Sequence, residues 1–162
     1  MTEYNIDFAE RLIVTARYAR GEGTYDFEAA QVVTYLTQLS IELSLKAFLE
    51  KAGLPVKQIK GFSHRLEDLL TSVGKCEVRQ EVTSGRLTYV PATGLRGIRV
   101  NGQNTVGDLI ARLVSEGSTY PDGIRYGTGF RGLEADIMLE LASEAHRFVN
   151  RHWDEVRLSP KL

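Results

Sequence analysis

The sequence predicts an all-α protein, an up-and-down helical bundle with a glycine-rich insertion at about residues 75–104. Five segments repeat apolar residues every three or four positions, which is the spacing of one helix face: 3–20, 26–52, 64–73, 105–116 and 132–157. Between 75 and 104 this period disappears. Helices that each carry an apolar stripe bury it by packing on one another, which favours a bundle.

Length and composition favour one domain spanning residues 1–162, with 43 % hydrophobic and 25 % charged residues. The formal net charge is −1, so the chain lacks the overall basic field that drives nonspecific nucleic-acid binding. Cys76 is the only cysteine, which excludes an intramolecular disulfide and a metal site built on several thiolates. We therefore expect no metal and no other cofactor.

The beginning of the chain, Met1 to Asp7, is acidic and lacks the basic-then-apolar order of a secretory signal. No run approaches the roughly 20 apolar residues that a membrane span requires. These observations predict a cytoplasmic protein that makes no contact with a membrane.

The segment 26–52 is the predicted central helix. Asp26 is placed to begin it, and Gly53 followed by Pro55 is placed to end it. Its apolar residues form two seams on nearly opposite sides: Ala29, Val32, Leu36, Leu39, Leu43 and Ala47 on one, and Ile41, Leu45, Phe48 and Ala52 on the other. A helix that is apolar over most of its circumference is surrounded by its neighbours.

The other helices have boundary signals of their own. Gly21 is expected to end the first helix, and Ser63 is a candidate N-cap for 64–73. Thr105 and Asp108 have the spacing of a capping box, and Pro121-Asp-Gly123 reads as a turn. The last helix, 132–157, is expected to bury one seam: Met138, Leu141, Ala145, Phe148, His152 and Val156.

Two interpretations stay open for the insertion. Residues 78–82 and 86–90 flank Thr83-Ser-Gly85, which fits a small β-hairpin, and Asn101-Gly102 is a second turn signal. The alternative is a mobile loop, because glycine and polar residues dominate this stretch.

Glu42 and Lys46 are one helical turn apart in the apolar central run, with the acid before the base. Charged side chains that lose water persist in proteins when they are paired. We therefore interpret them as a structural ion pair; a phosphate-binding role for Lys46 is the alternative.

Two motifs resemble the HEPN superfamily: Glu42-x-x-x-Lys46-Ala-x-Leu before Gly53, and Gly61-x-x-His64-x-Leu opening the next helix. The resemblance covers about residues 5–73, and the Ile124-Arg-Tyr126 segment and the last helix match more loosely. It implies a helical bundle that is often a homodimer.

The resemblance leaves two functions open. One is a non-catalytic interaction or nucleotide- or RNA-binding module in a prokaryotic phage-defence or toxin–antitoxin setting, with an antitoxin or a nucleotidyltransferase-type protein as partner. Lys46, His64 and Arg65 are the candidate phosphate ligands, since a helix N-terminus attracts anions. A structural alternative for His64 is a hydrogen bond to a neighbouring helix.

The other function is a metal-independent endoribonuclease, because Arg147-x4-His152 has the form of the HEPN nuclease motif. His152 would transfer a proton at the ribose or the leaving oxygen, and Arg147 would stabilise charge on the phosphate. A spacing of five separates the two side chains by about 140° on a regular helix. Catalysis would therefore require a kinked helix or a site shared by two subunits; the alternative is a core histidine beside a solvated arginine.

Three further features are predicted to carry no chemistry. Gly127-x-Gly129-x-x-Gly132 lacks the second strand of a dinucleotide-binding unit and is interpreted as a connector. A group of arginines is interpreted as part of a mixed, solvated surface: Arg96, Arg99, Arg112, Arg125 and Arg131. Cys76 is predicted to be inert.

Overall fold

The computed structural model describes residues 2–21, 26–115, 121–125 and 133–160. The helices are α1 (Ile6–Arg20), α2 (Phe27–Ala52), α3 (Val56–Gly61), α4 (Leu66–Gly74), η1 (Ala92–Leu95, a 3-10 helix), α5 (Val106–Ser115), α6 (Asp122–Arg125) and α7 (Ala135–Arg151). The strands are β1 (Cys76–Glu81), β2 (Leu87–Pro91), β3 (Arg99–Val100), β4 (Asn104–Thr105) and β5 (Arg157–Leu158).

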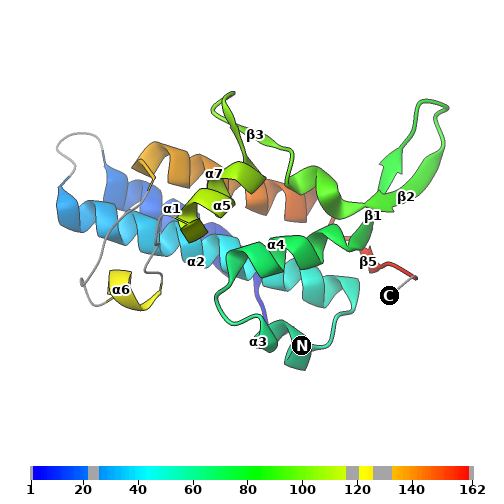
Figure 1. The fold of residues 1–162 in the computed structure, drawn as a ribbon, viewed down its shortest axis with the longest axis horizontal. Helices are drawn as coiled ribbons and strands as arrows, with labels where there is room; N and C mark the ends of the chain where they lie inside the picture. Colours follow the sequence, from blue (N-terminus) through cyan, green and yellow to red (C-terminus); the bar gives the residue numbers. More distant parts are fainter. Residues whose placement is uncertain (1, 22–25, 116–120, 126–132, 161–162) are drawn as a thin grey trace.

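The prediction of an all-α bundle is wrong: the described residues are 63 % helical and also form two antiparallel sheets. One sheet has the order β2-β1-β5, and the other pairs β3 with β4. The hairpin interpretation of the insertion is confirmed: β1 pairs with β2, and Val78 lies opposite Val90. The hairpin projects from one end of the molecule, close to the C-terminal strand (Figure 1).

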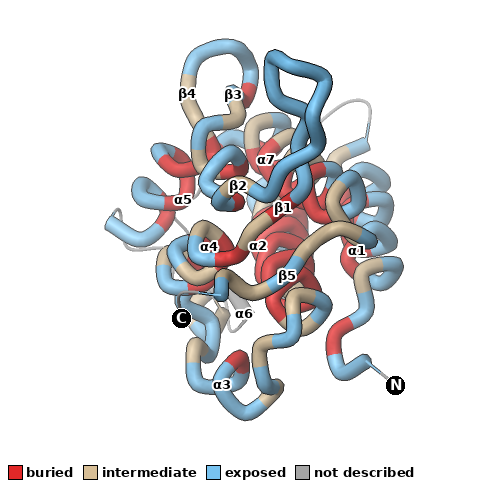
Figure 2. Tube along the Cα trace, turned by 90° about the vertical axis from the view of Figure 1, so that its right-hand side faces the viewer, coloured by how far each residue is buried: buried red, intermediate tan, exposed pale blue. Residues whose placement is uncertain are grey.

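Helix α2 is the centre of the fold, as predicted. Figure 2 shows its buried backbone in the middle of the molecule, with α1, α7 and α4 around it. Ile41, Leu45 and Phe48 are fully buried, and the Phe48 ring meets Phe148 of α7 with 5.9 Å between centroids. The N-terminal part of the helix is less enclosed, since Val32 is exposed.

Three predicted helix ends are confirmed by their capping geometry. The side chain of Asp26 accepts a hydrogen bond from the backbone N–H of Ala29 at 2.8 Å. Gly53 adopts the left-handed conformation, with φ of 103°, that glycine tolerates without a steric penalty. Thr105 and Asp108 exchange backbone-to-side-chain hydrogen bonds of 3.1 and 3.2 Å, which is the predicted capping box.

Other predicted boundaries are wrong. Helix α4 begins at Leu66 rather than after Ser63, and Ser63 itself has φ of 53°. The stretch before it contains the short helix α3 rather than a loop alone. The last helix ends at Arg151, because the chain then turns back to place β5 beside β1.

Candidate functional site

The Glu42–Lys46 ion pair is present and buried. The Lys46 Nζ lies 2.6 Å from Glu42 Oε1, and the two side chains are only 8 % and 4 % exposed. The ammonium also lies 5.6 Å from the centroid of the Tyr4 ring. The predicted ion pair is thus present, and Lys46 is enclosed by groups of its own chain.

His64 makes a contact with a neighbouring helix, as the structural interpretation of this residue predicted. Its Nδ1 lies 3.0 Å from Glu42 Oε2 across the gap between the segment before α4 and α2. Arg65 next to it lies 2.8 Å from Asp68. Both residues line a pocket of about 290 Å³ whose wall also carries the carboxylates of Glu67 and Asp68, a setting that disfavours phosphate.

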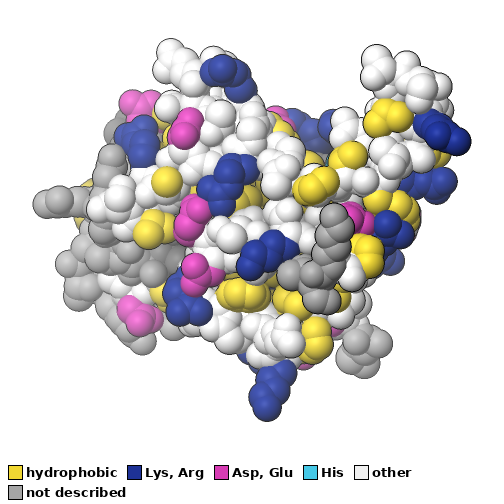
Figure 3. Space-filling model, turned by 45° about the vertical axis from the view of Figure 1, so that its right-hand side comes forward, with side chains coloured by type: hydrophobic (Ala, Val, Ile, Leu, Met, Phe, Trp, Pro, Cys, Tyr) yellow, Lys and Arg dark blue, Asp and Glu magenta, His cyan; other side chains and the backbone are white. Residues whose placement is uncertain are grey.

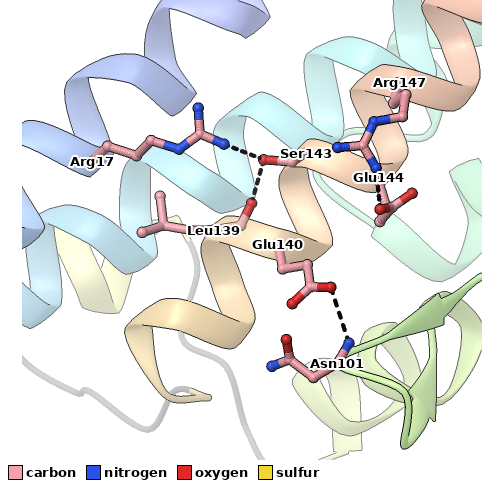
Figure 4. A network of polar contacts seen from close by, with 7 residues as sticks. All are labelled: Arg17, Asn101, Leu139, Glu140, Ser143, Glu144 and Arg147. Carbon is pink, nitrogen blue, oxygen red and sulfur yellow. Dashed lines mark hydrogen bonds and ion pairs between the residues drawn. The ribbon is translucent and has the colours of Figure 1, made fainter.

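Arg147 and His152 do not share a pocket. Arg147 lies on the exposed face of α7 and forms an ion pair with Glu144 (Figure 4). His152 is the residue that follows the last turn of α7, and it lines a different pocket, beside the β1–β2 hairpin. The two side chains therefore line different pockets of the described structure.

His152 is partly buried against an aromatic ring. Its centroid lies 4.7 Å from that of Phe148, and its buried Nδ1 has no hydrogen-bond partner among the described residues. Burial lowers the pKa of His152 below its usual 6.5, the charge of Arg151 lowers it further, and Glu155 acts in the opposite direction. The side chain is therefore a neutral imidazole at pH 7.

A basic pocket of about 440 Å³ lies between α1 and α7. Its lining includes polar side chains from both helices: Glu10, Arg17, Ser143, Arg147, Asn150 and Arg151. We call it the α1–α7 groove. Arg17 reaches across from α1 and donates to Ser143 Oγ at 3.0 Å, which ties the two helices together at this point (Figure 4).

The three arginines of the α1–α7 groove differ in their partners. Arg17 holds Ser143, and Arg147 holds Glu144. The Arg151 side chain has no hydrogen bond or ion pair to any residue in the described part of the chain, and it is exposed. One carboxylate, Glu10, lies in the lining against three guanidinium groups, so the groove favours an anion.

Sequence reasoning missed the α1–α7 groove because it concentrated on the spacing between Arg147 and His152. The signal that could have found it is the polar stripe on the last helix, at spacings of three and four: Ser143, His146, Arg147, Asn150 and Arg151. That stripe identifies a helix face, but not the arginine that α1 contributes.

A third pocket, of about 550 Å³, lies beside the β1–β2 hairpin, and we call it the hairpin pocket. It is lined by residues of β1, β2, η1 and the end of α7, including Val78, Val90, Phe148 and His152. Arg151 lines this pocket as well as the α1–α7 groove. The two sites are therefore neighbours.

The remaining candidates carry no site in the described residues. Arg96 pairs with Glu67 at 2.7 Å and Arg99 donates to the carbonyl of Gln103, while Arg112 is exposed on α5. The visible face in Figure 3 interleaves basic and acidic side chains, as expected for a solvated mixed surface. The glycine motif at 127–132, Arg131 and the side chain of Arg125 lie outside the described residues.

Cys76 is buried, and burial raises the pKa of its thiol to about 11. A thiol with this pKa is protonated at neutral pH and is a poor nucleophile, as the sequence predicted. Within the described ranges, no group of three or more histidine, cysteine, aspartate or glutamate residues is arranged to hold a metal ion.

In the part of the chain that the structure describes, no helix combines the length and the apolarity needed to cross a membrane. Comparison with protein-family models, with curated proteins and with solved structures yields no match to this chain.

Proposed function

We propose that this protein is a HEPN-like RNA-binding module that holds the backbone of single-stranded RNA in the α1–α7 groove. The observation that carries the proposal is the convergence of Arg17, Arg147 and Arg151 on one pocket from two helices. The resemblance supplies the expectation of RNA and of a prokaryotic defence or toxin–antitoxin setting. It also supplies the expectation of a homodimer with an antitoxin or nucleotidyltransferase-type partner, and the composition supplies that of a cytoplasmic protein.

The chemistry of the groove suits a phosphodiester. A guanidinium group presents donors in a planar fork that matches phosphate oxygens. Arg151 is exposed, and the bonds that Arg17 and Arg147 make to Ser143 and Glu144 are in contact with solvent, so phosphate can compete for them. Because the net charge of the chain is −1, binding would depend on this local cluster.

An aromatic side chain stands beside the groove. Tyr18 is 83 % exposed and lies one helical turn after Val14, which lines the groove. Bases of single-stranded nucleic acids stack on exposed aromatic rings next to basic grooves, with little dependence on sequence. Tyr18 therefore supports binding of a single strand rather than of a duplex.

Binding without cleavage is the favoured form of this function. In-line attack on a phosphodiester requires the general acid or base and the phosphate-stabilising cation at the same scissile group. Arg147 lines the groove while His152 lines the hairpin pocket, so their placement in one chain supports binding only.

The direct test measures fluorescence anisotropy of a labelled oligouridylate of about twelve nucleotides at several salt concentrations. The charge-removing variant is Arg17→Gln/Arg151→Gln, and the matched control, Lys57→Gln/Arg86→Gln, removes the same charge from exposed positions outside the groove. We expect the first variant to bind more weakly and to lower the slope of log K against log salt by about 1.4, for two lost phosphate contacts.

Equal affinities of the wild type and the groove variant would overturn the proposal. A deoxyoligonucleotide of the same sequence shows whether the site is selective for RNA. Incubation of the oligouridylate with EDTA tests cleavage: we expect intact RNA, and cleavage that is lost in His152→Ala would instead establish the nuclease.

A further inference from the structure

We propose that the hairpin pocket binds one unstacked base of the RNA strand while Arg151 holds the phosphate of that nucleotide. This inference rests on the proposed function, because the strand must first lie in the α1–α7 groove. It assigns the neighbouring pocket a role in base recognition that phosphate binding alone does not require.

The walls of the hairpin pocket suit a flat, weakly polar ring. Val78 and Val90 come from paired strands, and Phe148 comes from α7. The volume of about 550 Å³ falls within the range of roughly 300–1,000 Å³ that is common for pockets that bind small organic groups. Phe148 and His152 contribute aromatic rings to the lining, and unstacked bases pack well on such side chains.

A histidine side chain also lines this pocket. Nδ1 of His152 is buried and has no hydrogen-bond partner among the described residues. Because this atom is sealed from solvent, a ligand in the pocket would meet the rest of the imidazole ring. A neutral imidazole has one donor and one acceptor nitrogen, which point in diverging directions, so a base can bond to only one of them. Gln80 adds an amide at the rim.

Continuity with the α1–α7 groove favours a nucleotide over an unrelated small molecule. The Arg151 side chain belongs to the lining of both sites and makes no hydrogen bond or ion pair to the described residues. Its neighbour along the chain, His152, is the polar group of the hairpin pocket. A ligand with an anionic group beside a flat ring therefore fits the pair of sites, and each nucleotide of a single strand has this composition.

Gly94 allows the hairpin pocket to be blocked without removing a side chain. It lines the pocket, and a Cβ placed on it would lie 3.9 Å from Cε2 of Phe148, an ordinary van der Waals contact. The change Gly94→Ala is therefore tolerated, whereas Gly94→Leu extends a larger group from the same position into the space proposed for the base. The two variants form a matched pair.

The experiment compares two labelled probes of equal length, an oligouridylate and an abasic ribose-phosphate oligomer. We expect the wild type to bind the oligouridylate about tenfold more tightly, since contacts to one base are worth about 1–3 kcal/mol. Gly94→Leu should reduce this preference to the part that stacking on Tyr18 supplies and keep its affinity for the abasic probe, while Gly94→Ala should retain both. Oligoadenylate and oligocytidylate then report which base edge is accepted.

The outcomes separate the two proposals. If the wild type binds both probes equally and Arg17→Gln/Arg151→Gln weakens both, the base pocket is wrong and the α1–α7 groove stands. If neither probe binds, the proposed function fails and this inference fails with it. A loss of abasic binding in a folded Gly94→Leu variant would show that the substitution acts on the groove, and this too would overturn the inference.

Discussion

The ammonium of Lys46 lies 2.6 Å from Oε1 of Glu42, and the second oxygen of the same carboxylate lies 3.0 Å from Nδ1 of His64. The buried carboxylate of Glu42 therefore links Lys46, in the same helix, to His64, in the segment that precedes α4. Buried ion pairs contribute more to the choice of one packing arrangement than to total stability in some proteins. The Glu42 carboxylate is placed to fix how α2 and the start of α4 meet.

Removal of one partner of this pair should be costly. In Glu42→Leu, Lys46 remains buried without its counter-charge, so we expect the free energy of unfolding to fall by about 3–5 kcal/mol. Urea denaturation followed by circular dichroism measures this change. The double variant Glu42→Leu/Lys46→Met removes both charges and should recover most of the loss; a double variant as unstable as the single one would contradict the account.

Gly107 packs against the backbone of Arg96, to whose carbonyl its N–H donates at 2.9 Å. A Cβ at this position would overlap Cγ of Arg96 and lie 3.2 Å from its carbonyl oxygen. The Arg96 side chain is held by Glu67 and Thr71 and has little freedom to move. Gly107→Ala should therefore lower the free energy of unfolding by about 1–3 kcal/mol.

Gly61→Ala is the matched comparison, because a Cβ there meets nothing within 4 Å. Alanine reduces the conformational freedom of the unfolded chain, so this variant should be about 0.4–1 kcal/mol more stable than the wild type. The two melting temperatures should move in opposite directions. A shift of the same sign in both would contradict the assignment of Gly107 to a close approach.

Cys76 should react slowly in the folded protein. A rise in the pKa from 9.0 to about 11 reduces the thiolate at pH 8 roughly a hundredfold, and burial restricts access further. Release of thionitrobenzoate from Ellman's reagent measures the rate, with the protein unfolded in urea as the comparison. Equal rates in the two states would show that the thiol is not buried.

The pH dependence of stability should include a contribution from His152. Burial keeps the folded-state pKa below 6.5, so the unfolded chain takes up a proton first as the pH falls. The stabilising contribution is complete above about pH 6.5 and is lost as the pH falls from there through the lower pKa of the folded state. The difference in melting temperature between His152→Gln and the wild type should therefore change across this range; a constant difference would argue against a buried neutral imidazole.

The sequence alone determined the central helix. Its boundaries depend on Asp26 and Gly53, which act through hydrogen bonds and backbone conformation within a few residues of each end. The pairing of Glu42 with Lys46 follows from a spacing of four on the same helix. Local interactions of this kind are recorded directly in the order of the residues.

The β1–β2 hairpin is an intermediate case. Its turn signal at Thr83-Ser-Gly85 was readable, and Gly85 does have a positive φ of 72°. The signal did not decide between a hairpin and a loop, because its outer residues are exposed and show no buried alternation. Pairing of β1 with β5 holds the base of the hairpin, and β5 is remote in sequence.

Only the tertiary structure decided the fold class and the candidate site. Arg157 and Leu158 form a strand because β1 offers them an edge, and two residues carry no period that could predict this. Likewise, Arg147 and His152 are five positions apart and line different pockets, whereas Arg17 and Ser143 are far apart in sequence and touch. The spacing of two residues in the sequence determines the angle between their side chains around one helix. Which side chains of different helices come into contact depends on how those helices pack.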